Sequence, residues 1–87
     1  MYEILLSREA VKYYQKQADD LKSRLNKAID SLSSEPIKNP QVKKLHGQFE
    51  GNYRLRVGEI RIVYEIDHKS KIVRIKAIKS RENAYKR

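Results

Sequence analysis

Basic and apolar residues alternate along the second half of the chain, in the segments 52–57, 59–67 and 71–78. Because successive side chains of a β-strand point to opposite faces of a sheet, this alternation would collect cations on one face. The cations collected in this way are Arg54, Arg56, Arg61, Arg74 and Lys76. Neighbouring strands lie only about 4.8 Å apart, so these side chains repel one another unless an anion lies between them. The pattern therefore indicates a phosphate-binding surface, for which the planar guanidinium of arginine is well suited.

The overall charge favours this interpretation. The 87 residues carry a formal net charge of +9 at pH 7. An excess of this size attracts phosphate polyanions, whose counterions are released on binding. A merely solvated outer face of a sheet is the plainer alternative, and an acidic protein or an anionic membrane would also be attracted. We interpret the charge as a sign of a nucleic-acid partner.

Other kinds of site find little support in the sequence. The chain has no cysteines, which excludes disulfides and thiolate metal sites. His46 and His68 lie far apart and lack supporting ligands at metal-binding spacing. The glycines form neither a P-loop nor a dinucleotide-binding fingerprint, and no Ser-His-Asp arrangement is suggested. We expect no metal and no small-molecule cofactor.

The same features bear on the compartment. No run approaches the roughly 20 apolar residues of a membrane span, and residues 1–6 do not resemble a secretion signal. Because the sequence has no cysteines, it gives no indication of an oxidising compartment. We expect a cytoplasmic protein with no membrane contact.

The elements that must position the cations can be predicted from the periodicity. Residues 2–6 predict a strand, and Ser7 follows as the N-cap of a helix over residues 8–17. Apolar residues recur at three- and four-residue spacing over residues 21–32, which predicts a second, amphipathic helix. Residues 33–40 contain both prolines and are expected to form a loop.

The three alternating segments predict an antiparallel meander, because the connections at Gly58 and at residues 68–70 are short enough for hairpins. The face opposite the cations is apolar and is expected to contain Leu55, Ile60, Ile62, Tyr64, Val73, Ile75 and Ala77. We therefore predict one α+β domain spanning residues 1–87. In it, two N-terminal helices pack on one face of a four-stranded, mainly antiparallel sheet, in the order strand, helix, helix and three strands.

Four motifs follow one another along the chain: Leu45-His-Gly47, Tyr53-Arg-Leu-Arg-Val57, Ile60-Arg-Ile-Val-Tyr-Glu-Ile66 and Ile78-Lys-Ser-Arg-Glu-Asn-Ala-Tyr85. In this order and spacing they make the chain resemble the RelE/ParE toxin superfamily of bacterial and archaeal toxin–antitoxin pairs. Within that superfamily the chain is most similar to the RelE-type mRNA interferase toxins. The resemblance covers essentially the whole chain and implies a RelE-like fold.

The resemblance also implies a function and a set of partners. RelE-type toxins cleave mRNA in the ribosomal A site, where the 2′-hydroxyl attacks the adjacent phosphate without the help of a metal. ParE-type toxins share the fold but inhibit DNA gyrase, and they remain the alternative. The implied partners are a cognate antitoxin, the ribosome and mRNA. The set of cations favours the endoribonuclease.

The resemblance assigns roles by motif position. Arg61 matches the catalytic arginine of the central strand. Arg56, which forms a basic pair with Arg54 on the preceding strand, is also expected to be catalytic. Arg81 matches the second catalytic cation, with Lys79 as the alternative. Tyr85 matches a tyrosine that stacks on or orients the substrate base. The residues expected to bind RNA are Arg54, Lys43, Lys44, Arg74, Lys76 and Lys79.

Two positions depart from the pattern of the superfamily. Ser80 stands where many relatives have a histidine, so an imidazole acid is missing there. Arg56 stands at a lysine position, and a guanidinium is a poor general base because it hardly ever loses its proton. Tyr85 is therefore the expected proton acceptor. Glu50 or Glu65 could also accept the proton, but both are expected in salt bridges.

Overall fold

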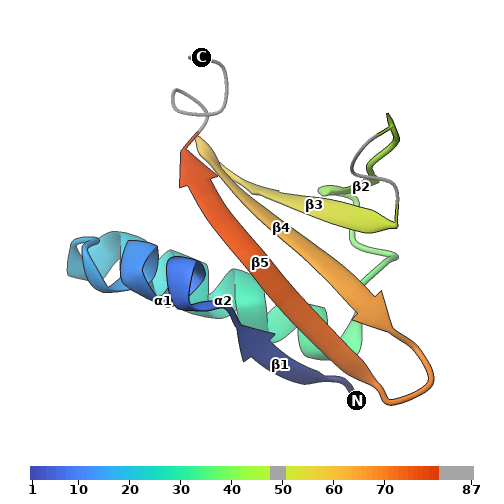
Figure 1. The fold of residues 1–87 in the computed structure, drawn as a ribbon. Helices are drawn as coiled ribbons and strands as arrows, with labels where there is room; N and C mark the ends of the chain where they lie inside the picture. Colours follow the sequence, from blue (N-terminus) through green and yellow to red (C-terminus); the bar gives the residue numbers. More distant parts are fainter. Residues whose placement is uncertain (48–50, 81–87) are drawn as a thin grey trace.

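The helices and strands follow one another as expected from the sequence, with one addition. The computed structural model describes residues 1–47 and 51–80. These residues form β1 (Glu3–Leu6), α1 (Arg8–Gln15), α2 (Asp19–Ser34), β2 (Val42–Lys44), β3 (Asn52–Val57), β4 (Ile60–Asp67) and β5 (Ile72–Ser80). The predicted α+β fold is confirmed, and both helices lie on one side of the sheet (Figure 1).

The strands form a single five-stranded sheet in the order β1-β5-β4-β3-β2. β1 runs parallel to β5, whereas the other neighbouring strands are antiparallel. The meander predicted for β3, β4 and β5 is confirmed. Its first turn contains Gly58, whose φ of 60° is a left-handed conformation that glycine adopts readily.

β2 was not expected from the sequence, so the predicted number of four strands was wrong. Its residues Val42, Lys43 and Lys44 pair with β3 at the edge of the sheet. Val42 is half-buried, but both lysines are exposed. A strand this short, with two exposed residues in succession, lacks the two-residue alternation by which strands are recognised.

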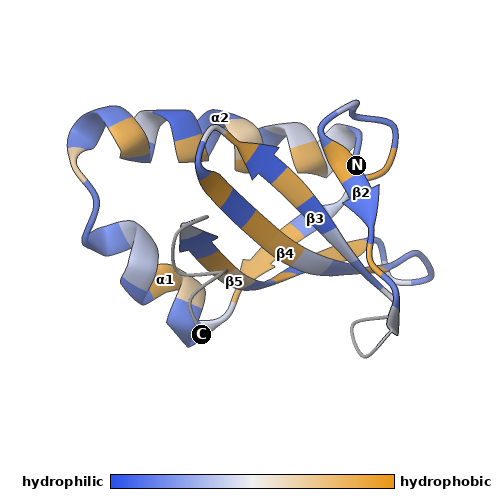
Figure 2. Ribbon diagram, turned by 90° about the horizontal axis from the view of Figure 1, so that it is seen from above, coloured by the Kyte–Doolittle hydropathy of each residue, from blue (hydrophilic) through white to orange (hydrophobic). Residues whose placement is uncertain are grey.

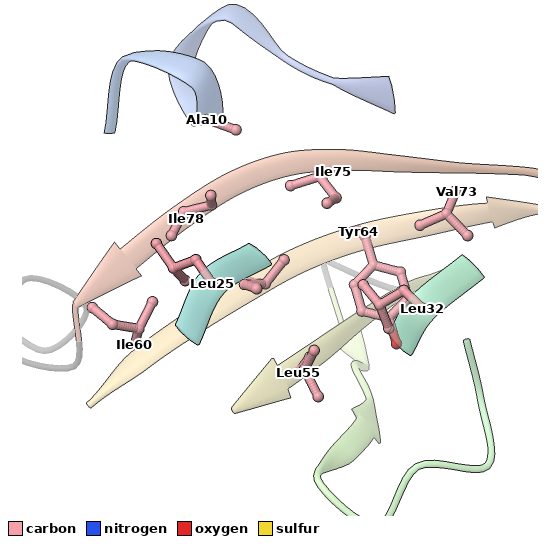
Figure 3. Close-up of a cluster of buried hydrophobic side chains, with 10 residues drawn as sticks. Ala10, Leu25, Leu32, Leu55, Ile60, Tyr64, Val73, Ile75 and Ile78 are labelled. Carbon is pink, nitrogen blue, oxygen red and sulfur yellow. The ribbon is translucent and has the colours of Figure 1, made fainter. Parts of the chain in front are cut away.

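One apolar core joins the helices to the sheet. Leu25 and Leu32 of α2 and Ala10 of α1 are completely buried. Figure 3 shows the two leucines directed at the buried side chains of the strands. Those side chains are Leu55, Ile60, Ile62, Tyr64, Val73, Ile75 and Ile78. The predicted apolar face is therefore confirmed except at one position, and Figure 2 shows the alternation of apolar and polar residues along the strands.

The exception arises from a β-bulge between β4 and β5. Val63 pairs with Ala77, but the next residue, Tyr64, pairs with Ile75, so that Lys76 is an extra residue in β5. An extra residue reverses the alternation of side chains beyond it. Ile78, which is only 2% exposed, therefore joins the core, whereas Ala77 lies on the opposite face from the one predicted.

Tyr64 ties the proline-containing loop to the core. Its hydroxyl donates a buried hydrogen bond of 2.6 Å to the carbonyl oxygen of Pro36. Its ring also stacks on that of Tyr53, with ring centroids 5.8 Å apart. Burial raises the pKa of the Tyr64 hydroxyl well above its usual range, so the phenol stays neutral and continues to donate. The connection between α2 and β2 is thereby held against the sheet.

Replacement of Ile62 by alanine tests the assigned core. Ile62 is completely buried, so Ile62→Ala should lower the free energy of unfolding by about 2–5 kcal/mol through lost apolar contacts and a residual cavity. Val11→Ala, at a residue that is 36% exposed, is the control and should change it by about 0.5 kcal/mol or less. Chemical denaturation measures both values, and equal losses would contradict the assignment.

Candidate nucleic-acid interface

The pairing of the strands brings cations from three strands into one row. Arg56 of β3 lies opposite Arg61 of β4, which in turn lies opposite Lys79 of β5. Such directly opposed residues have Cα atoms about 4.5–5.5 Å apart and side chains on the same face. Beside this row, Lys43 of β2 lies opposite Arg54 of β3. We call the helix-free side that carries these five residues the cationic face: Lys43, Arg54, Arg56, Arg61 and Lys79.

A groove of about 470 Å³ lies on the cationic face. Its charged lining consists of Arg54, Arg61, Lys76 and Lys79 from the sheet and Glu9 from α1. The remaining lining residues are Leu45, Asn52, Val63 and Ala77. Cations set among apolar side chains meet an anion where fewer water molecules screen the charges, which strengthens their attraction. The groove is therefore suited to a phosphate group.

A second, smaller hollow of about 190 Å³ lies next to the groove. Its charged lining is Lys43, Arg54 and Arg56, and Pro40 and Gln41 complete it. Arg54 thus lines both spaces. Because successive phosphates of a nucleic acid follow one another along the strand, neighbouring cationic hollows fit consecutive phosphates.

Ion pairs offset the charge at the other end of the same face. Arg74 lies 3.8 Å from a carboxylate oxygen of Glu65 and 3.9 Å from one of Asp67. The Nζ of Lys76 lies 3.4 Å from the second oxygen of Glu65. Exposed pairs of this kind stabilise the fold by about 1 kcal/mol or less, but they place negative charge directly beside two of the cations. The predicted salt-bridge role of Glu65 fits these distances.

The start of α1 is fastened to β5 at the bulge. The backbone N–H of Ser7 donates to the carbonyl oxygen of Ile75 at 2.9 Å, and its hydroxyl donates to that of Lys76 at 2.7 Å. The same hydroxyl accepts the N–H of Ala10 at 3.1 Å and so caps the helix. These bonds bring Glu9, in the first turn of α1, to the edge of the groove. The sequence alone did not suggest Glu9, because the contact depends on β1 pairing with β5.

The predicted site residues fall into three groups. Most lie on the helix-free side of the sheet: Lys43, Arg54, Arg56, Arg61, Arg74, Lys76 and Lys79. Lys44 does not join them, because its pairing with Tyr53 turns it toward the helix-covered side at the sheet edge. Arg81 and Tyr85 lie outside the described residues, as does Glu50.

Within residues 1–47 and 51–80 no group of three or more His, Cys, Asp or Glu side chains could hold a metal ion. Neither α1 nor α2 is long and apolar enough to cross a membrane.

Residues 4–85 match the family described as the ParE toxin of type II toxin–antitoxin systems, parDE. Among curated proteins no sequence is similar enough to match the chain.

Solved structures resemble the chain over most of its length. A chain of the archaeal RelE–RelB complex from Pyrococcus horikoshii OT3 is 29% identical, with a TM-score of 0.79 over 92% of this chain and 94% of that one. A chain of the intact E. coli RelBE toxin–antitoxin complex is 21% identical, with a TM-score of 0.75 over 92% and 96%. The YoeB/ParE toxin from Agrobacterium tumefaciens is 16% identical, with a TM-score of 0.79 over 90% and 96%. The last two likenesses show a shared fold.

A matched pair of lysines in β5 tests the cationic face. The affinity for a short single-stranded RNA should fall as salt concentration rises. Lys79→Ala should make this dependence of log affinity on log salt concentration shallower by about 0.7 in slope, the value for one lost phosphate contact. Lys76→Ala should change the slope less, because Glu65 already offsets the charge of Lys76. Fluorescence anisotropy over a range of salt concentrations gives both slopes. Equal slopes for the two variants would show that the ion pair with Glu65 does not weaken the contribution of Lys76 to anion binding.

Proposed function

Because this chain belongs to the ParE toxin family of type II toxin–antitoxin systems, within the RelE/ParE superfamily, we propose that it is a toxin of the RelE type. In this proposal residues 1–87 act as one domain that cleaves mRNA in the ribosomal A site, as a metal-independent endoribonuclease. The observation that carries the proposal is the row of Arg56, Arg61 and Lys79 across three strands.

The proposed reaction needs cations at one point in space. Attack of the 2′-hydroxyl oxygen on the adjacent phosphorus produces a phosphorane that carries more negative charge than the phosphodiester. Preorganised cations aimed at this charge lower the barrier more than they tighten binding. Arg61 has a cation directly opposite it on each neighbouring strand, and we assign it to the phosphorane.

The other cations are assigned to the same path of RNA. Lys43 and Arg54 line the smaller hollow and would bind the phosphate next to the scissile one, together with Arg56. Arg81 is proposed as the second catalytic cation by motif position, and Lys79, which lies opposite Arg61, is the alternative. Tyr85 is proposed to stack on the substrate base.

A cognate antitoxin is the proposed protein partner. The structures from Pyrococcus horikoshii and E. coli are complexes of RelE with RelB, in which a toxin and an antitoxin are bound together. With a net charge of +9, this chain would attract an acidic segment to the cationic face. A segment covering the groove would exclude RNA and so neutralise the toxin in the cytoplasm.

Inhibition of DNA gyrase is the second candidate function. It is favoured by the match of residues 4–85 to a family described by its ParE toxin. A gyrase inhibitor of this kind binds its target and performs no chemistry. It would therefore use the cationic face for binding alone, without a distinction between Arg61 and its neighbours.

Single-turnover cleavage on ribosomes programmed with a defined message tests the ribonuclease. Arg61→Ala should reduce the cleavage rate by about 10²-fold or more, the scale of losing a preorganised donor to a developing oxyanion. Affinity for the ribosome should change little, because the lost interaction strengthens only in the transition state. Toeprinting detects the cut, and co-sedimentation measures the binding.

Arg74→Ala is the matched control, since Arg74 lies on the same side of the sheet but is paired with Glu65 and Asp67. It should leave the cleavage rate within a few-fold of the wild type. If the wild-type protein leaves messages uncut but stops supercoiling by gyrase, the ribonuclease proposal is wrong and the ParE-like alternative is favoured.

A further inference from the structure

The proposed cleavage needs a proton acceptor as well as cations. The 2′-hydroxyl must lose its proton as its oxygen bonds to phosphorus, and a positioned base typically accelerates such a step by about 10²–10⁴-fold. Lysine and arginine are protonated at neutral pH and are poor acceptors. Of the described residues that line the groove, Glu9 is the only carboxylate. The inference developed here rests on the proposed ribonuclease function.

The backbone around Glu9 is held in place from both sides. Ser7, two residues earlier, makes its two hydrogen bonds to the carbonyl oxygens of Ile75 and Lys76. Ala10, the next residue, is completely buried in the core. The backbone at Glu9 is therefore positioned at the edge of the groove, where its exposed side chain is accessible to a bound substrate.

The two carboxylates of β4, Glu65 and Asp67, already have other partners. Glu65 pairs with Arg74 and Lys76. Asp67 accepts the backbone N–H groups of Lys69 and Ser70 at 3.1 and 3.0 Å and so shapes the β4–β5 turn. The hydrogen bond from the Ser70 backbone lowers the pKa of Asp67, which makes this carboxylate a weaker base. Neither residue lines the groove.

We propose that Glu9 is a catalytic residue that accepts the proton of the attacking 2′-hydroxyl. The O2′–P bond forms as the proton passes to the carboxylate, and the P–O5′ bond breaks. The leaving 5′-oxygen takes a proton from water, and the protonated carboxyl of Glu9 returns its proton to solvent. The products are a 2′,3′-cyclic phosphate and a 5′-hydroxyl, with no change in oxidation state.

The surrounding charges fit this role. Arg54 of β3, Arg61 of β4 and both Lys76 and Lys79 of β5 line the groove with Glu9. Lys12, one turn further along α1, is the nearest cation on its own helix toward the C-terminus. The cations can therefore be directed at the phosphate, while Glu9 at the edge of the same groove faces the attacking hydroxyl.

Glu9 also has a structural role that any test must separate from catalysis. Glu9 lies in the first turn of α1, where a carboxylate interacts favourably with the helix dipole. Glu9→Gln would remove this stabilisation along with the base. The experiment therefore needs a readout that a change in helix stability does not produce.

Three variants provide that readout on programmed ribosomes between about pH 5.5 and 8.5. Glu9→Gln should lower the single-turnover cleavage rate by about 10²-fold or more, the range expected for a lost general base. Glu35→Gln removes an identical charge at the far end of α2 and should leave the rate unchanged. Glu9→His should recover at least about ten-fold of the lost rate, with a rise in rate centred near the imidazole pKa of about 6.5.

The possible failures can be told apart. If wild-type protein cuts the message and Glu9→Gln cuts it equally fast, Glu9 is not the base and the proposed function stands. If Tyr85→Phe loses the rate while Glu9→Gln keeps it, the proton acceptor is Tyr85. A slow Glu9→His variant with no rise near pH 6.5 would assign Glu9 a purely structural role. Wild-type protein that cuts no message would remove both the proposed function and this inference.

Discussion

The ladder between β4 and β5, with its one extra residue at Lys76, determines which side chains lie on each face of the sheet. Without that residue Ala77 would point into the core, and Lys79 would point to the helix side, away from Arg61. The bulge instead buries Ile78 and sets Lys79 opposite Arg61. One local irregularity therefore fills the core with a larger side chain and completes the row of cations.

The two faces of the sheet depend on each other because they share the same backbone. Packing of Leu25 and Leu32 on the buried side fixes β3, β4 and β5 in register. The cations on the other side then remain close together although they repel one another. The free energy gained by burying the apolar face offsets this repulsion, so that the cations are already gathered before an anion arrives. Stability in one layer thus supports a strained arrangement of charge in the other.

Much of the fold could be predicted from local patterns, and the parts that could not have physical reasons. The alternation in β3 and β4 assigns Leu55, Ile62 and Arg61 to their faces, because side chains alternate wherever pairing is regular. The bulge could not be predicted from local patterns, since it depends on how β5 pairs with β4. β2 could not be predicted because three residues are too few for a pattern. The position of Glu9 at the groove could not be predicted either, because the parallel pairing of β1 with β5, and not the sequence around Glu9, brings α1 there.

Arg54 lines both the groove and the smaller hollow, and this shared position makes the two spaces thermodynamically linked. An anion that draws the guanidinium toward one space changes the charge and the shape that the other presents. Linkage of this kind is reciprocal, so whatever the first anion does to the affinity for the second, the second does equally to the first. The two spaces cannot be treated as independent sites. A polyanion that occupies both at once meets a single coupled surface, whose affinity is not the sum of two separate anion affinities.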